Sequence, residues 1–195
     1  MWVSRERFID VLDAIAGRDD VRITFDDGNA SDVEHALPAL RERRLAASFF
    51  VVADRVGEPG FLDEAGVRAL ASSGMTVGCH GLHHRPFRSI GDRALRDELL
   101  DAKRSLEAIV GGPVQVAACP FGSYDRRVLG TLRRCGFRTV YTSDRGTARS
   151  HAWIQARNTV HRGDRPDLLE RIVSDERPPH RAWRRGAERA VKRWR

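Results

Sequence analysis

The stretch Val21-Arg22-Ile23-Thr24-Phe25-Asp26-Asp27-Gly28 is the most informative part of this sequence. Its first five residues are rich in β-branched and aromatic side chains, which predicts a short buried strand over 21–25. In α/β folds the carboxyl ends of parallel strands carry the functional residues, so the two aspartates are candidates for an active site. Neighbouring side chains on a strand point in opposite directions. One aspartate is therefore expected to hold a metal ion while the other moves a proton.

A second cluster follows a second predicted strand. Met75–Cys79 is short and apolar, and it runs into His80-Gly81-Leu82-His83-His84. His80 and His84 are four residues apart, so one helical turn would place both imidazoles on one face. Two imidazoles and one carboxylate leave coordination positions open, which is typical of a catalytic metal site. His83 could compete with His84 for this role.

A third cluster follows a third predicted strand, over 114–118. The segment Cys119-Pro120-Phe121-Gly122-Ser123 comes next. Pro120 cannot continue a ladder of hydrogen bonds and Gly122 permits a positive φ, so the chain is expected to turn sharply here. Such a turn can direct a backbone N–H at an oxyanion.

Strands and helices are predicted to alternate along the whole chain, which favours a parallel α/β fold. With 195 residues the chain is long enough for one domain but short for an eight-unit barrel of about 250 residues. The expected strands cover residues 21–25, 47–52, 75–79, 114–118, 136–141 and 153–160. The expected helices cover residues 2–16, 31–44, 62–73, 92–110, 124–135 and 167–174, with Ser31 or Asp32 as the cap of the second.

Together the three clusters resemble the motifs of the polysaccharide deacetylases, the NodB-homology proteins of carbohydrate esterase family 4. That family carries Thr-Phe-Asp-Asp-Gly, then His-(Ser/Thr)-x-x-His, then a Pro-(Phe/Tyr)-Gly turn that usually follows an arginine. The same order occurs here, and the resemblance covers roughly residues 20–160. It implies an irregular, trimmed (β/α)7 barrel and a hydrolase that removes N-acetyl or other N-acyl groups from amino sugars of a polysaccharide, oligosaccharide or glycolipid precursor.

The resemblance also implies roles for individual residues. Asp26 would be the general base, and the backbone N–H of Phe121 would help to stabilise the oxyanion. A divalent metal, most often zinc in this family, would be bound by Asp27, His80 and His84.

The sequence departs from the family pattern at three places. Gly81 stands where the family prefers a hydroxyl, and Ala118 stands where it has the arginine that orients the catalytic aspartate. A branch of the family that acts on exopolysaccharide amino sugars has a similar Ala-x-Pro pattern. We expect Arg157 to supply the orienting charge and Pro120 to shape the substrate-binding turn. No clear general acid is present, and His161 is a better candidate than His151, which lies in a polar loop.

The positive charge of the chain is concentrated at its end. The formal net charge is +7, and residues 181–195 carry seven basic side chains and one acid. The rest of the chain is nearly neutral, which argues against nucleic-acid binding as its main function. We expect a catalytic domain over 1–178 and a basic amphipathic helix over 179–195. This helix would pack on the barrel or contact an anionic membrane surface.

The three cysteines form no paired framework, and no apolar run approaches the roughly 18 residues of a membrane span. The expected setting is therefore cytoplasmic. Two other functions remain open from the residues alone. Two histidines and a carboxylate also describe a non-haem iron oxygenase. The missing motif arginine is also compatible with a catalytically weak or silent protein that binds glycans.

Overall fold

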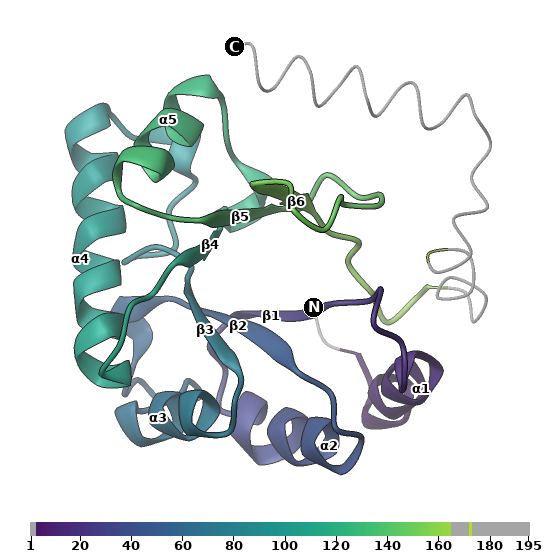
Figure 1. The fold of residues 1–195 in the computed structure, drawn as a ribbon. Coiled ribbons are helices and arrows are strands. Elements are labelled where there is room, and N and C mark those ends of the chain that lie inside the picture. The colour runs from purple at the N-terminus through teal and green to yellow at the C-terminus, as the bar shows by residue number, and fades with distance from the viewer. Residues whose placement is uncertain (1–2, 165–171, 173–195) are drawn as a thin grey trace, which may run out of the picture.

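The computed structural model describes residues 3–164 and residue 172. Six parallel strands form one sheet in the order of the sequence, so every connection is a crossover between neighbouring strands. Figure 1 shows that the sheet curls and that the helices cover its outer side. The strands are β1 (Ile23–Asp27), β2 (Ala47–Val51), β3 (Thr76–Cys79), β4 (Val116–Ala118), β5 (Thr139–Thr142) and β6 (Ile154–Ala156).

The helices begin and end at residues suited to these positions. Ser4, Asp63 and Asp125 each accept a hydrogen bond from a backbone N–H of the first turn. Gly111 ends the longest helix in the left-handed conformation. The helices are α1 (Arg5–Ile15), the π-helix η1 (Asp32–Ala36), α2 (Leu37–Glu42), α3 (Glu64–Ser72), α4 (Asp92–Val110) and α5 (Arg126–Arg134). Short 3-10 turns are η2 (Ala53–Arg55), η3 (Phe87–Ser89) and η4 (Pro120–Gly122).

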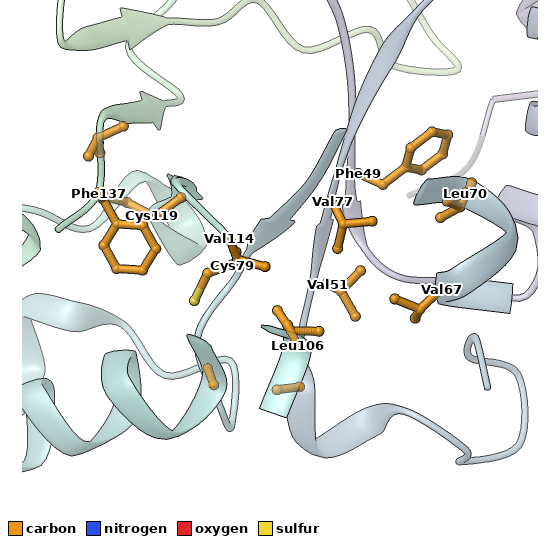
Figure 2. Packing of buried hydrophobic residues seen from close by; sticks show 14 of the residues in the cluster. Phe49, Val51, Val67, Leu70, Val77, Cys79, Leu106, Val114, Cys119 and Phe137 are labelled. Carbon is orange, nitrogen blue, oxygen red and sulfur yellow. The ribbon is translucent and has the colours of Figure 1, made fainter. Parts of the chain in front are cut away.

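The main core lies between the sheet and its helices. Phe49 and Val51 are two residues apart on β2, so their side chains point to the same face of the sheet, and both pack in this core. Figure 2 shows these residues near side chains of β3 and α3, with Leu106 of α4 close by. Full burial of each large apolar side chain contributes about 1.5–3 kcal/mol to folding.

The opposite face of the sheet lines the inside of the curl. Phe50 of β2 points there and forms a small second cluster with Ala118 and Tyr141. Gly78 of β3 is the register partner of Phe50, and a Cβ at Gly78 would lie 2.5 Å from the Phe50 ring. Only glycine fits at this position. Asp26 is the register partner of Phe50 on the other side, so the first aspartate faces the same interior.

The expected fold class is confirmed, with differences in detail. The described residues form six strands of an open, curled sheet, one strand fewer than the seven units expected of the irregular, trimmed barrel. The late strand is shorter than the predicted 153–160, because the chain leaves the sheet after Ala156. The predicted helix 167–174, the basic helix over 179–195 and the domain boundary at 178 concern residues outside the described part, apart from residue 172.

The predicted helix over 31–44 is wrong in one respect. It consists of the π-helix η1 followed by α2, and Ser31 makes no side-chain cap. Asp32 instead accepts the backbone N–H of Asn29 at 3.1 Å, so it stabilises the turn that follows β1. A buried carboxylate needs such a partner, and the local turn supplies the nearest donor.

Candidate metal centre and active site

Three side chains from two strand ends form a possible metal site. Asp27 ends β1, whereas His80 and His84 follow β3, and their ligand atoms lie within 4.8 Å of one another. The Oδ1 atom of Asp27 is 3.2 Å from Nε2 of His84 and 3.7 Å from Nε2 of His80. The structure thus brings together the three residues that the sequence pattern singled out as ligands.

The two histidines do not lie on a helical turn, so that prediction is wrong. The segment after β3 is a loop, in which Gly81 has φ +84° and His84 has φ +57°. These two left-handed residues bend the chain so that the imidazole rings come to 5.0 Å between centroids. The loop therefore brings the His80 and His84 rings together, as a helical turn would have done.

The two aspartates also converge, although strict alternation would separate them. Asp26 faces the interior, and its Oδ2 atom lies 3.9 Å from Nε2 of His80. Asp27 would face the helices on a regular strand, but its φ of +78° turns the chain out of the extended conformation. As a result both carboxylates lie within 4 Å of the same imidazole nitrogen.

His80 is held in one orientation. Its side chain is 3% exposed, and its Nδ1 atom lies 3.0 Å from the carbonyl oxygen of Ala118. A carbonyl only accepts, so we assign the proton to Nδ1, which leaves the Nε2 lone pair directed at Asp27. Burial lowers the pKa of His80, although the charge of Asp26 opposes this. Burial likewise lowers the pKa of His84 against the charge of Asp27, and neutral imidazoles are the form that binds metal.

Asp26 is paired with Arg157, which lies just beyond β6. The guanidinium donates two hydrogen bonds to the carboxylate, at 2.6 and 2.8 Å, and a third to the Thr24 hydroxyl at 3.0 Å. Burial alone would raise the pKa of Asp26, but the charge and hydrogen bonds of Arg157 hold this pKa below its ordinary value. The bidentate pair also joins β1 and β6, the two edge strands of the open sheet.

The turn after β4 presents a backbone donor next to the histidines. Phe121 has φ +57°, and its backbone N–H has no acceptor among the described residues. Its ring lies 4.6 Å from the His84 ring, and the residue is 69% exposed. Pro120 is buried and fixes the start of the turn. The sharp turn predicted from Pro120 and Gly122 is present.

The remaining histidines have other surroundings. The Nδ1 atom of His83 lies 2.7 Å from a carboxylate oxygen of Asp54, away from the Asp27 cluster. His151 lies in an exposed turn. His161 follows β6 and is half-buried, and its backbone N–H donates to Asp164 at 2.5 Å.

Comparison with known proteins identifies the family of this chain. The family model described as polysaccharide deacetylase matches residues 14–140, which is more than half of the chain. The chain belongs to the polysaccharide deacetylase family.

Two curated relatives of this chain have low sequence identity to it. It is 29% identical over 124 residues to a peptidoglycan-N-acetylglucosamine deacetylase of Bacillus cereus, covering 63% of this chain and 56% of the relative. It is 23% identical over 128 residues to YxkH of Bacillus subtilis, covering 66% and 46%. The chain thus spans about half the length of these curated relatives.

Solved structures support the family fold. The deacetylase PplD of Streptococcus pyogenes, in complex with acetate, superposes with a TM-score of 0.78 at 16% identity, covering 90% of this chain and 88% of that one. IcaB of Ammonifex degensii gives a TM-score of 0.71 at 23% identity, covering 88% of each chain. At these identities the likeness concerns the fold.

Two acidic residues near the centre were not predicted from the sequence to lie there, although Asp32 was a candidate helix cap. Glu98 of α4 is buried and accepts the backbone N–H of His83 at 2.7 Å. Asp32 is also buried, and burial together with the charges of Asp27 and Asp26 raises its pKa to about 7. Both acids belong to amphipathic stretches rich in charged residues, where nothing in the sequence distinguishes them from solvent-exposed neighbours.

Proposed function

We propose that this chain is a metal-dependent hydrolase that removes N-acetyl, or another N-acyl, groups from amino sugars of a glycan or glycolipid precursor. The observation that carries this proposal is the convergence of Asp27, His80 and His84 beside Asp26, whose carboxylate is held by Arg157. Family membership supports the same reaction class.

The donor set fits a divalent cation. Two neutral imidazoles and one carboxylate form a three-residue set with positions left for water or substrate, as in catalytic zinc sites. The contact of His80 Nδ1 with the Ala118 carbonyl oxygen orients the ring for such a role. When bound, the cation supplies Lewis acidity toward the acyl carbonyl and lowers the pKa of water from about 16 to about 7. Zinc is the metal that we propose.

Asp26 is proposed as the general base. Its lowered pKa keeps the carboxylate ionised, and Arg157 fixes both of its oxygens. Asp26 therefore accepts a proton from the water molecule that attacks the acyl carbon. Arg157 holds the base in place, which is the role that the family gives to the arginine missing at Ala118.

The turn after β4 is proposed to stabilise the tetrahedral oxyanion. The N–H of Phe121 donates a hydrogen bond to the developing negative charge, and Pro120 fixes the turn that presents this donor. The departing amine then needs a proton, and His161 is our candidate for this acid. Of the two sequence candidates, His161 is half-buried beyond β6, whereas His151 lies in an exposed turn.

Acetate release from a panel of N-acetylated glycans tests the proposal. The purified protein is stripped with a chelator and reloaded with zinc, and acetate is measured before and after reloading. Release that is lost on stripping and restored by zinc supports the metal-dependent reaction. Tight sugar binding without acetate release would instead favour the silent glycan-binding alternative. Oxygen consumption with ferrous iron would favour an oxygenase.

The setting of the reaction is a further part of the proposal. Cys79, Cys119 and Cys135 form no disulfide and are all buried, which supports the proposed cytoplasmic location. No helix among residues 3–164 is both long and apolar enough to cross a bilayer. The proposed contact of residues 179–195 with an anionic membrane is tested by vesicle binding of the full chain and of a chain ending at residue 178.

A further inference from the structure

Glu98 lies in an unusual environment for a glutamate. It is 3% exposed and comes from the face of α4 that packs against β3. Removing a carboxylate from water is expensive unless hydrogen bonds compensate. Among the described residues, the one hydrogen-bond donor to Glu98 is the backbone N–H of His83, at 2.7 Å. The partner of this buried acid is therefore the loop that carries the two histidine ligands.

Other anchors hold the first part of this loop. The N–H of His80 donates to the carbonyl of Val51 at 2.9 Å. The carbonyls of Gly81 and Leu82 accept hydrogen bonds of 3.1 and 3.0 Å from the N–H groups of Ala53 and Asp54. These bonds fix the loop to β2 and η2 as far as residue 82. The next donor along the chain, the His83 N–H, is held by Glu98 alone.

His84 comes directly after this last anchor. Its φ of +57° is unfavourable for a residue with a side chain, so the backbone on either side must hold it in place. The backbone N–H and the ring of His80 are bonded to Val51 and Ala118. The described residues give His84 side-chain contacts but no backbone hydrogen bond, so its backbone position follows that of His83. Losing the Glu98 contact would therefore affect His84 more than His80.

Gly81 belongs to the same arrangement. A Cβ at this position would lie 2.9 Å from Oε1 of Glu98 and 3.2 Å from the Phe87 ring. The carboxyl group thus occupies space that a side chain at residue 81 would need. Residue 81 therefore has no room for a hydroxyl-bearing side chain while the Glu98 carboxyl group occupies this position.

We propose that Glu98 is a positioning residue for metal binding: it fixes the loop 80–84 through the His83 N–H and so places His84 next to Asp27. This inference rests on the proposed metal-dependent function. Groups that orient metal ligands typically account for about 10–100-fold in metal affinity. The effect of Glu98 is expected in this range.

The test compares zinc affinity between variants of two glutamates of α4, Glu98 and Glu107. Glu107 also accepts a backbone N–H, from Val114 at 2.9 Å, but it does so next to the amino end of β4, away from the histidines. Zinc dissociation constants are measured by competition with a chromophoric chelator for the wild type, E98L, E98Q and E107L. We expect E98L to bind zinc about 10–100-fold more weakly and E107L to match the wild type. E98Q, whose amide oxygen accepts the same hydrogen bond, should lose less than E98L.

A second measurement needs no metal. Amide hydrogen exchange of the metal-free wild type should show a protected His83 N–H, and E98L should lose this protection while E107L keeps it. An unprotected His83 amide in the wild type would overturn the inference, as would equal zinc affinities in folded E98L and E107L. A wild type that binds no zinc would overturn the proposed function itself, which distinguishes the two failures.

Discussion

The two ends of the sheet differ in how many residues with a side chain adopt positive φ. At the carboxyl end, Asp27, His84, Phe121 and Arg145 do so, in addition to the glycines Gly28, Gly57, Gly60, Gly81, Gly122 and Gly146. At the amino end, the described residues with positive φ are glycines with one exception, Arg44. These glycines are Gly17, Gly74, Gly111 and Gly136.

This difference separates structural turns from functional ones. A glycine after a helix adopts the left-handed conformation without a steric penalty. A residue with a Cβ costs roughly 1–2 kcal/mol there, and the surrounding structure must offset this cost. At the carboxyl end, three of the four strained residues are the proposed metal ligands Asp27 and His84 and the proposed oxyanion donor Phe121. The strain therefore marks the residues to which we assign the chemistry.

A second contrast concerns two arginine–aspartate pairs, one before β1 and one whose aspartate belongs to β1. Arg18 and Asp20, before the strand, form two hydrogen bonds of 3.0 and 2.8 Å at an exposed site. Arg157 and Asp26 form an equally bidentate pair, but the arginine side chain is 12% exposed and comes from 131 residues away. Both are bidentate arginine–carboxylate pairs, but only the Arg157–Asp26 pair lies beside the histidines.

The largest effect is expected from the aspartates of these two pairs. Asp26→Asn removes the proposed base and should lower turnover by about 10²–10⁴-fold while zinc content stays unchanged. Asp20→Asn is the matched control and should leave turnover unaltered. Acetate release and metal analysis check both variants, and normal turnover of Asp26→Asn would refute the role of this aspartate.

His84 and His83 are neighbours in one loop, but only His84 is a proposed metal ligand, so their alanine variants should differ. His84→Ala removes a proposed ligand and should weaken zinc binding by more than roughly 100-fold, beyond the range expected for residues that only orient ligands. His83→Ala removes a side chain that contacts Asp54 instead, so zinc affinity should change little. Chelator competition measures both, and a reversed order would assign the ligand role to His83.

The arginines of the two pairs predict a change in pH dependence. Burial raises the pKa of Asp26 and Arg157 lowers it, so Arg157→Gln should raise this pKa. Because the base must be ionised, activity should then be lost at a higher pH on the acidic side. The acid limb of the kcat/KM profile should move upward relative to the wild type. Arg18→Gln should leave it in place, and an unmoved limb in Arg157→Gln would contradict the proposed pairing.

Glycine substitutions give the smallest expected effects. Gly74 and Gly81 have φ of +79° and +84°, but a Cβ at Gly74 would meet nothing within 4 Å. Gly74→Ala should therefore lower the free energy of unfolding by about 1–2 kcal/mol through backbone strain alone. Gly81→Ala adds the clash with Glu98 and should cost more, with weaker zinc binding. Denaturant unfolding measures the difference, and equal losses would show that Glu98 adapts.

Much of this molecule could be predicted from local pattern. Short apolar runs flanked by turn residues placed β1 to β5 within a few residues, because the pattern reflects burial in a parallel sheet. That the aspartates and the histidines meet could be predicted, because the carboxyl ends of parallel strands share one edge of the sheet. The choice of Asp27, His80 and His84 as the ligands came from the family resemblance. Arg157 was identified as a candidate for the orienting charge, and it lies against Asp26.

Other features could not be predicted, since they depend on backbone conformation at single residues. The spacing of His80 and His84 suggested a helical turn, but the loop is shaped by positive φ at Gly81 and His84. Alternation suggested that Asp26 and Asp27 diverge, whereas one left-handed residue makes them converge. Neither conformation has a periodic signal in the sequence.

Three features of this protein follow from its sequence alone: the class of fold, the edge of the sheet where chemistry is expected and the types of side chain available there. These follow from hydrophobic pattern and from residue chemistry, which are local properties of the chain. Three other features require the folded chain: the Ala118 carbonyl oxygen orients His80, Arg157 reaches Asp26 between the edge strands, and Glu98 lies under the histidine loop. Each of these contacts joins segments that are distant in sequence, so it exists only once the sheet has curled and the helices have packed.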